Sequence, residues 1–308
     1  MNITIHRASS RGHANHGWLD TYHTFSFANY FNPERMQFGA LRVLNDDKVL
    51  PEEGFGTHPH KNMEVVSIPL KGRLRHGDSL NNSHTITRGK IQVMSAGTGI
   101  LHSEFNDSPT EPLEFLQIWI IPDRVNAPPR YRDYNIAPLL KHNEISTFLA
   151  PETDISIMQQ AWFSWAELDR GIEREYQFKG RNTGVYIFVI EGEIKIGDAI
   201  LHSRDGAGIT DTETVSMEAL QNSTVLLMEV AVCPAFRLRV ALLRRQFFTP
   251  RRSFFCCAGN GLSSIPTAPV RSTVHPEPRW KQSSPLRIPG LPCRCSIRQT
   301  VPRTTAEL

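Results

Sequence analysis

The chain has 308 residues and a net charge of +3. Residues 1–232 are acidic, with 21 Lys and Arg against 29 Asp and Glu, whereas residues 233–308 are basic, with 13 Lys and Arg against two Asp and Glu. This charge is no signal for nucleic-acid binding, and since all five cysteines lie beyond Val232, the first part has no disulfide framework and no thiolate metal site. No run approaches the roughly 20 apolar residues of a membrane helix, and the N-terminus lacks an apolar signal segment, so we expect a cytoplasmic protein without direct membrane or nucleic-acid contacts.

Short segments rich in β-branched and aromatic residues follow one another from Gln37 onward, separated by turns with glycine, asparagine or aspartate. Long helical periodicity is absent, although one short helix is expected to begin at Ser164–Leu168. The pattern predicts an all-β fold of antiparallel sandwich or barrel type. The clearest expected strands are Met63–Leu70, Ile91–Met94, Leu113–Ile121, Gly184–Ile190, Glu193–Ile196 and Thr224–Val232.

A polar, proline-rich stretch near residues 123–133 separates these strands into two groups. On either side a buried strand runs into a glycine turn, in Met63–Gly72 and again in Val185–Gly192. We therefore expect two related β domains, 1–122 and 134–232, joined by a linker or crossover at 123–133.

Residues 233–308 alternate Arg, Pro and Ser with isolated apolar residues and show no sustained period. The cysteine spacings, Cys256-Cys257 and Cys293-x-Cys295, match no zinc site. We expect an unstructured basic tail, and our hypothesis is that it is an out-of-frame or read-through product. The functional alternative is a contact with nucleic acid or a membrane surface.

Two histidines, His58 and His60, alternate within Gly54–Glu64 (GFGTHPHKNME). In an extended strand they share a face, at a separation that lets both imidazoles reach one cation about 2.0–2.1 Å from each nitrogen. Gly54 and Gly56 permit a close approach of the backbone. His-x-His alone is a weak signal, because most such pairs are surface or core histidines.

A second cluster, His102 and Glu104, follows a glycine-rich turn in Met94–Glu104 (MSAGTGILHSE), and the same alternation puts both side chains on one face. If the two strands are neighbours in a barrel, three imidazoles and one carboxylate meet in its interior, at a high cost unless a cation is bound. Ligands of nitrogen and oxygen without sulfur suit Fe(II), Mn, Ni, Cu or Zn. The alternative is a set of separate hydrogen-bonded polar residues.

The identity of the carboxylate ligand stays open at this point. Glu64 shares the parity of His58 and His60, so it too is a candidate for the barrel interior. The alternation of side chains along a strand does not decide whether Glu64 or Glu104 is the carboxylate ligand.

His-x-His-x3-Glu ending at Glu64, then Gly72, then the glycine-rich turn before His102 resemble the two motifs of the cupin superfamily. A closer resemblance is carried by six blocks: Gly17–Tyr30, Phe38–Asp46, Gly54–Glu64, His76–Ser79, Gln92–Asn106 and Leu116–Pro122. On these blocks the chain resembles the pirin family, bicupin proteins that include bacterial quercetin 2,3-dioxygenases. The resemblance runs from near the N-terminus to about Val232 and does not extend into the tail.

The resemblance implies two tandem cupin (jelly-roll-like) β-barrels, of which the first binds one divalent metal ion. Carried onto this sequence, the family's metal ligands are His58, His60, His102 and Glu104, and Glu64 has a packing or supporting role. Fe(II) is the expected ion, with Zn, Mn, Ni, Cu or Co as alternatives, and no other cofactor is expected.

The second domain departs from the first, because Glu175–Gly184, its counterpart of the HPH region, has no histidine, and His202 stands alone. We expect His202 to be a surface or hydrogen-bonded residue, and 134–232 to be structural or to form part of the substrate entrance. His23 is expected to pack or hydrogen-bond near the domain interface. The other histidines are expected in polar turns without an assigned role: His13, His16, His76 and His84.

The activity implied by the resemblance is that of a metal-dependent dioxygenase cleaving flavonols such as quercetin, with a small aromatic substrate and O2 as its partners. Glu104 is the candidate catalytic residue that takes the hydroxyl proton. Phe25, Phe27 and Phe55 are candidates to line an apolar entrance, although aromatic residues are more often plain core. The alternative is an iron-dependent redox-sensing regulator that binds a transcription factor or a metabolic enzyme, and a third reading is a small-molecule-binding cupin without chemistry.

Overall fold

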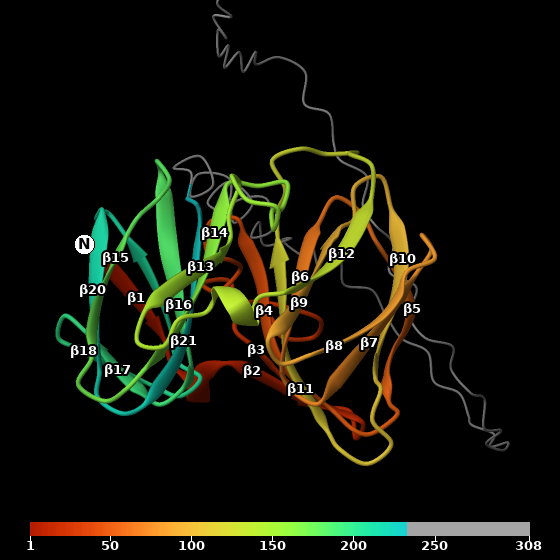
Figure 1. Cartoon of the computed structure of the whole chain (residues 1–308), viewed down its shortest axis with the longest axis horizontal. Helices are drawn as coiled ribbons and strands as arrows, with labels where there is room; N and C mark the ends of the chain where they lie inside the picture. Colours follow the sequence, from red (N-terminus) through yellow and green to blue (C-terminus); the bar gives the residue numbers. More distant parts are fainter. Residues whose placement is uncertain (233–308) are drawn as a thin grey trace, which may run out of the picture. The chain divides into compact units, whose positions relative to one another are not determined.

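The computed structural model describes residues 1–232, so the expected tail at 233–308 lies outside the described residues. Regular structure in 1–232 consists of strands and two short 3-10 turns, η1 (Ala8–Ser10) and η2 (Ala137–Leu139). In this part of the chain no helix is long and apolar enough to cross a membrane. The strands form four antiparallel sheets that make two β-barrels, which confirms the all-β prediction (Figure 1).

The first barrel consists of a seven-stranded and a four-stranded sheet, and Leu74 and Ile86 of the smaller sheet pack with Val49 and Phe115 of the larger. The seven-stranded sheet runs in the order β12 (Arg130–Asn135), β9 (Lys90–Ser95), β6 (Glu64–Lys71), β11 (Leu113–Ile120), β4 (Leu41–Val49), β3 (Leu19–His23), β2 (Gly12–Asn15). The four-stranded sheet runs β5 (Gly54–His60), β10 (Ile100–Asn106), β7 (Arg73–Asp78), β8 (Ser83–Thr87).

The second barrel consists of a six-stranded and a four-stranded sheet around an apolar interior that includes Ile187, Ile194, Met217 and Leu227. The six-stranded sheet runs β1 (Asn2–His6), β19 (Gly206–Thr210), β16 (Thr183–Glu191), β21 (Ser223–Ala231), β14 (Ala161–Leu168), β13 (Ile145–Leu149). The four-stranded sheet runs β15 (Glu173–Gln177), β20 (Thr214–Ala219), β17 (Glu193–Ile196), β18 (Ala199–His202).

Two strands cross the domain boundaries expected from the sequence. β1, at the N-terminus, pairs with β19 of the second barrel and is the red arrow among the blue-green strands of Figure 1. β12 begins inside the expected linker 123–133 and pairs with β9 of the first barrel. The division into 1–122 and 134–232 therefore stays a prediction, and each barrel includes a strand from outside its expected range.

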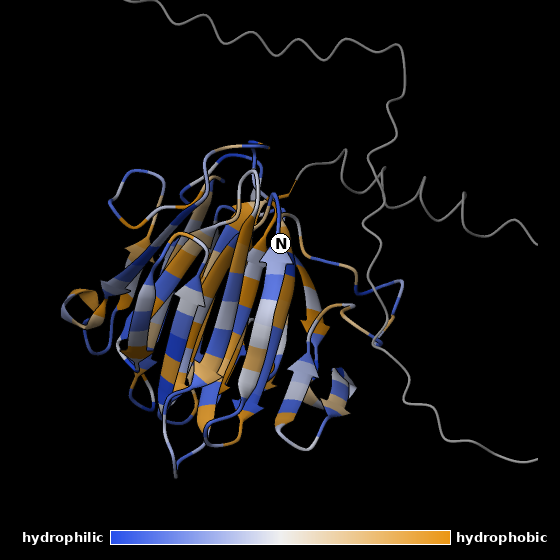
Figure 2. Cartoon of the chain, turned by 90° about the vertical axis from the view of Figure 1, so that its right-hand side faces the viewer, coloured by the Kyte–Doolittle hydropathy of each residue, from blue (hydrophilic) through white to orange (hydrophobic). Residues whose placement is uncertain are grey.

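The larger sheets of the two barrels share one hydrophobic core. Ile118 of β11 contributes to this core together with Phe163, Phe188 and Met228 of the second barrel. Phe115, by contrast, lies in the interior core of the first barrel, because successive residues of a strand point to opposite faces. The strands are accordingly banded in colour in Figure 2, which shows hydropathy.

The six strands expected from the sequence are confirmed, with ends that differ by at most one residue. The expected helix at Ser164–Leu168 is wrong, since these residues belong to β14 between β13 and β21. Phe163 and Trp165 face the shared core and Ala166 and Leu168 the second barrel's interior. A strand buried on both faces lacks the alternation of apolar and polar residues by which strands are recognised.

The repeated glycine turn expected from the sequence occupies the same place in both barrels. Gly72 follows β6 with φ of +80°, and Gly192 follows β16 with φ of +90°. A Cβ atom on Gly72 would overlap the backbone of Pro112 at the start of β11, and one on Gly192 the backbone of Asn222 at the start of β21. Since β6 pairs with β11 and β16 with β21, the two turns are structurally equivalent.

Candidate metal centre

Three histidines come together in the first barrel because β5 and β10 are antiparallel neighbours. His102 lies directly opposite His58 in this pair, so the expectation that the two strands are adjacent is confirmed. The ring centroids of His58 and His60 are 5.0 Å apart, and those of His102 lie 4.4 Å from His58 and 4.8 Å from His60. The three imidazoles therefore converge on one point from two strands.

The nitrogen atoms of this cluster are spaced as ligands of one ion would be. The Nε2 atoms of His58 and His102 are 3.0 Å apart, and one ligand atom from each of the three histidines lies within 4.8 Å of the others. Two nitrogens each about 2.0–2.1 Å from an ion and at right angles to one another would be about 2.9 Å apart. The donor set therefore fits a divalent cation.

Hydrogen bonding orients His58 toward such an ion. Its Nδ1 lies 2.8 Å from the carbonyl oxygen of Gly56, which only accepts, so Nδ1 carries the hydrogen. The Nε2 atom of a neutral His58 is then left with its lone pair facing His102. A carbonyl that fixes the free nitrogen in this way is the usual support of a metal-binding histidine.

The environment keeps two of the imidazoles, those of His60 and His102, uncharged. Burial, together with the nearby His58, His60 and His76, lowers the pKa of His102 to about 2. Burial and His58 lower the pKa of His60 to about 4. At neutral pH both rings are neutral, which is the protonation state that binds a metal ion.

Glu104 lies deeper in the barrel, in a second group of candidate ligands, His76, His102 and Glu104, that shares His102 with the first. Both oxygens of its buried carboxylate accept hydrogen bonds: Oε1 from Ser67 Oγ at 2.9 Å and from Gln92 Nε2, and Oε2 from Gln117 Nε2 at 2.6 Å. Burial raises the pKa of Glu104, and the bonds from Ser67 and Gln117 offset part of that rise. The structure thus brings Glu104 next to His102 within a ring of donors.

Glu64 belongs to neither group of candidate ligands in residues 1–232. Its carboxylate accepts hydrogen bonds from Ser95 Oγ at 2.5 Å and from the backbone N–H of Met158 at 3.1 Å. The parity argument fails because His58 and His60 lie on β5 and Glu64 begins β6 in the other sheet. Alternation holds within one strand, not across a turn that changes sheets.

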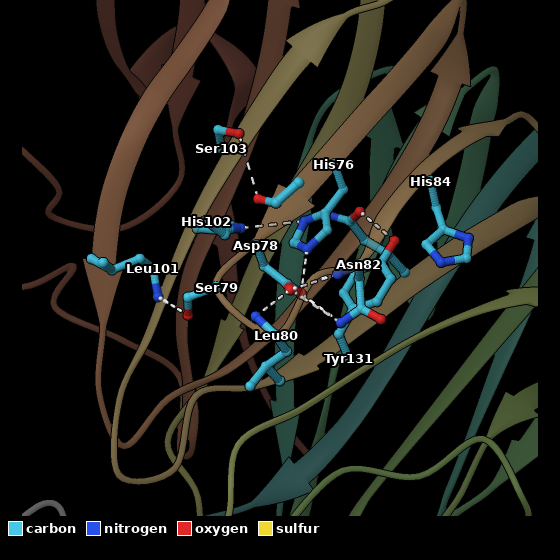
Figure 3. Close-up of polar contacts among 12 residues, drawn as sticks. His76, Asp78, Ser79, Leu80, Asn82, His84, Leu101, His102, Ser103 and Tyr131 are labelled. Atoms are coloured by element: carbon cyan, nitrogen blue, oxygen red, sulfur yellow. Dashed lines mark hydrogen bonds and ion pairs between the residues drawn. The ribbon is translucent and has the colours of Figure 1, made fainter.

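The expectation that His76 lies in a polar turn is wrong. His76 is on β7, its side chain is completely buried, and its Nε2 lies 2.9 Å from Oδ2 of Asp78 (Figure 3). Its ring stacks on Tyr131 of β12, with centroids 3.9 Å apart and 10° between the planes. Alternation with the buried Leu74 is the sequence signal that places His76 inside the barrel.

The other histidines without an assigned role are more exposed. His13 lies in β2 and His84 in β8 rather than in turns, and they form ion-pair contacts with Asp20 and Asp133. His16 lies between β2 and β3, in a connection as expected.

Aromatic residues adjoin the cluster on the side of His60. The indole of Trp119 stands edge-on to His60 at 4.8 Å between centroids, and Phe27 contacts Trp119 at 5.3 Å. Of the expected entrance residues, Phe25 is instead buried against Tyr186, and Phe55 packs on Trp18. Trp119 was not expected from the sequence, although it shares the inward parity of Phe115 on β11.

The expectation for His202 is confirmed, and so is the hydrogen bonding of His23, whereas a place for His23 near the domain interface stays a prediction. His23 is buried, and its Nδ1 hydrogen-bonds Oδ1 of Asn45 at 3.0 Å. His202 is exposed and pairs with Glu193 at 2.8 Å. In the described part of the chain, both groups of candidate ligands lie in the first barrel.

Two β-barrels with a histidine cluster that fits a metal ion in the first define the class of metal-dependent bicupins. The family model described as Pirin matches residues 4–120, and the one described as Quercetinase C-terminal cupin domain matches residues 150–230. The chain belongs to the pirin family.

Several relatives have much of their length in common with this chain. It is 40% identical to a protein of Escherichia coli named quercetin 2,3-dioxygenase, over 74% of this chain and 98% of that protein. It is 35% identical to a pirin-like protein of Caulobacter vibrioides, over 71% of this chain and 96% of that protein. The crystal structure of the bacterial pirin YhhW from Escherichia coli in complex with nickel(II) superimposes with a TM-score of 0.71 at 39% identity, covering 75% of this chain and all of that one.

Proposed function

We propose that this chain is a metal-dependent dioxygenase of the pirin type, which cleaves flavonols such as quercetin with O2. The observation that supports this most strongly is the convergence of His58, His60 and His102 in a chain 40% identical to a protein named quercetin 2,3-dioxygenase. A small aromatic substrate and O2 are the partners of this activity. The cytoplasmic location expected from the sequence stays a prediction.

The proposed ligands of a single divalent ion are His58, His60, His102 and Glu104. Imidazole and carboxylate ligands suit Fe(II), the ion we propose, and also Zn, Mn, Ni, Cu and Co. The related pirin YhhW was crystallised with nickel(II), which supports a divalent metal ion at this site. When bound, the ion supplies a Lewis-acid charge that favours the deprotonated form of a substrate hydroxyl.

Glu104 is the proposed acceptor of that hydroxyl proton. Its pKa is raised by burial, which makes the carboxylate a better base near neutral pH than an exposed glutamate. The hydroxyl of Ser67 and the amides of Gln92 and Gln117 hold the ionised carboxylate in place before it takes the proton. The proton would then remain in a region enclosed by protein.

The aromatic side chains beside the cluster support a planar aromatic substrate. Phe27 and Trp119 lie on the side of His60, where their faces and edges would contact flavonol rings. The second barrel presents an apolar interior and carries no comparable group of ligands in the described residues. It therefore has a structural role in this proposal, or contributes to the substrate entrance.

Turnover of quercetin tests the proposal. Protein loaded with Fe(II) without air and then mixed with quercetin and air should bleach the flavonol absorbance, consume one O2 per flavonol and release carbon monoxide. The His102→Ala protein, treated in the same way, should leave the absorbance unchanged. Absence of turnover with Fe(II), Mn, Ni, Cu, Co and Zn would overturn the proposal, and capture of a protein partner by the ferric form alone would favour the redox-sensing regulator.

A further inference from the structure

The proposed function leaves unused a buried pair of side chains directly behind His102. His76 and Asp78 lie on β7, the neighbour of β10, and both side chains are completely excluded from solvent. His76 Nδ1 is 3.5 Å from His102 Nδ1, and His76 Nε2 is 2.9 Å from Asp78 Oδ2 (Figure 3). The three side chains form a continuous line from a carboxylate to the histidine cluster.

The direction of the hydrogen bonds in this line is set by Asp78. Its Oδ1 accepts the backbone N–H groups of Leu80 and Asn82, and the Asn82 amide donates to both oxygens. Burial favours the protonated acid, but the hydrogen bonds from His76, Asn82 and Leu80 outweigh it and lower the pKa of Asp78. Asp78 is thus an anion that only accepts, so His76 Nε2 must donate to it.

The tautomer of His102 follows from that of His76. When His76 carries a single hydrogen, that hydrogen is on Nε2, and the lone pair of its Nδ1 faces His102. The hydrogen between the two rings must then belong to His102 Nδ1. This leaves the lone pair of His102 Nε2 pointing at Nε2 of His58, whose own hydrogen is directed to the Gly56 carbonyl.

The position of the His76 ring, which lies between Asp78 and His102, is also fixed. Tyr131 stacks on His76 nearly parallel, at 3.9 Å, and the Tyr131 hydroxyl hydrogen-bonds Gln92 Oε1 at 3.4 Å. Tilting the His76 ring out of this plane would lose the stack, and a half-turn within the plane would lose the hydrogen bond from Nε2 to Asp78. The backbone of β7, the carboxylate and the stacked phenol together hold Nδ1 toward His102.

We propose that Asp78 and His76 are positioning residues that hold His102 as the Nδ1–H tautomer and so direct its Nε2 lone pair at the metal ion. This inference rests on the proposed function, since it concerns a ligand of the proposed metal site. Partners of this kind typically change metal affinity by about 10–100-fold.

The tautomer is measured directly in the metal-free protein. Nitrogen-15 NMR of the full chain, with histidine side chains labelled, at pH 8, should show His102 protonated on Nδ1 and unprotonated on Nε2. Assignment uses the loss of one signal pair in His102→Gln. A wild-type His102 protonated on Nε2 would overturn the inference without reference to any metal or to activity.

Three variants test the direction of the hydrogen bonds from Asp78 through His76 to His102. In Asp78→Asn the new amide can donate to His76 Nε2, which would reverse both hydrogen bonds and put the hydrogen on His102 Nε2, the wrong tautomer for a ligand. We expect the Ni(II) affinity, measured by competition with a chromophoric chelator, to fall about 10–100-fold. His76→Asn keeps an acceptor for His102 in its amide oxygen and should lose less affinity than His76→Phe, which keeps only the stack on Tyr131.

The matched control is His84→Phe, on the neighbouring strand β8 directly opposite His76. His84 is exposed and has its ion-pair contact with Asp133, so this variant should keep wild-type Ni(II) affinity and the wild-type His102 tautomer. Equal Ni(II) affinity in wild type, Asp78→Asn and His76→Phe would overturn the inference while leaving the metal site intact. Failure of the wild-type chain to bind Ni(II) or Fe(II) would instead overturn the proposed function.

Discussion

The Nε2 atoms of His58 and His102 face each other at 3.0 Å, while the Nδ1 atoms of the two rings turn away to the Gly56 carbonyl and to His76. Lone pairs brought this close repel each other unless a proton or a cation lies between them. Burial lowers the pKa of His102 to about 2, which disfavours a second proton on this ring at neutral pH, and the one hydrogen of each ring is held at Nδ1 in the tautomers inferred above. The arrangement is therefore stabilised by metal binding.

Removal of the His102 side chain, which belongs to both groups of candidate ligands, should abolish the metal site. His102→Ala should reduce the bound metal, measured by elemental analysis after loading with Fe(II) or Ni(II), from about one ion per chain to near zero. His202→Ala removes an exposed histidine paired with Glu193 and should retain the ion. A His102→Ala protein that is folded by circular dichroism and still holds one ion would contradict the proposed ligand set.

The two buried glutamates should respond differently to truncation. Glu104→Ala should weaken metal binding and lower quercetin turnover by about 10²–10⁴-fold, the range for loss of a general base. Glu64→Ala should retain metal, but should lower the free energy of unfolding by about 1–3 kcal/mol, because Ser95 and the Met158 N–H lose their buried acceptor. Metal loss in Glu64→Ala with retention in Glu104→Ala would reverse the assignment.

The glycine turn of the second barrel should tolerate no side chain. Gly192→Ala combines a positive φ, which costs an L-residue about 1–2 kcal/mol, with overlap on the backbone of Asn222. Gly171, with φ of +84° and open space around its Cβ position, is the matched control and should show the conformational cost alone. Urea denaturation should therefore rank the free energies of unfolding as wild type, Gly171→Ala, Gly192→Ala, and equal losses in the two variants would contradict the overlap.

Acid should destabilise the metal-free protein partly through His6, at the contact between the barrels. Burial and, to a lesser extent, Arg35 lower the pKa of His6 from 6.5 to about 4, and its Nδ1 hydrogen-bonds the Tyr186 hydroxyl at 2.9 Å. Between these values the unfolded chain binds the proton and the folded chain does not. Above pH 6.5 the protonation of His6 therefore does not change the free energy of unfolding. As the pH drops from 6.5 toward 4, His6 lowers the free energy of unfolding by about 1.4 kcal/mol per pH unit.

His6→Asn keeps a polar partner for Tyr186 and removes the titrating group. Urea denaturation at several pH values should show a slope between pH 6.5 and 4 that is smaller by about 1.4 kcal/mol per unit than in wild type. The same slope in both proteins would show that His6 is protonated in the folded state.

Alternation within single strands predicted the parts of the site that each strand carries. His58 with His60, and His102 with Glu104, converge in the interior because each pair lies two residues apart on one strand. The same rule misled for Glu64, since the chain changes sheets between His60 and Glu64. Parity is a property of one pleated strand and carries no information through a turn.

The residues that the sequence did not reveal come from pairings distant along the chain. Alternation with Leu74 indicates that His76 faces the barrel interior, but only the pairing of β7 with β10 shows that it lies behind His102. Tyr131 comes from the expected linker and reaches His76 because β12 extends the sheet beside β9. Register between strands, which the composition of a segment does not encode, decides which side chains meet.

The pairing of β1 with β19 makes the first six residues part of the second barrel. A fragment that starts at residue 134 would expose the backbone N–H and C=O groups of β19 as a free edge, which invites aggregation with other chains. During synthesis the emerging N-terminus must remain unpaired until about 200 further residues have left the ribosome. The two barrels are therefore poor candidates for separate expression, and the amino end is a risky place to attach an affinity tag.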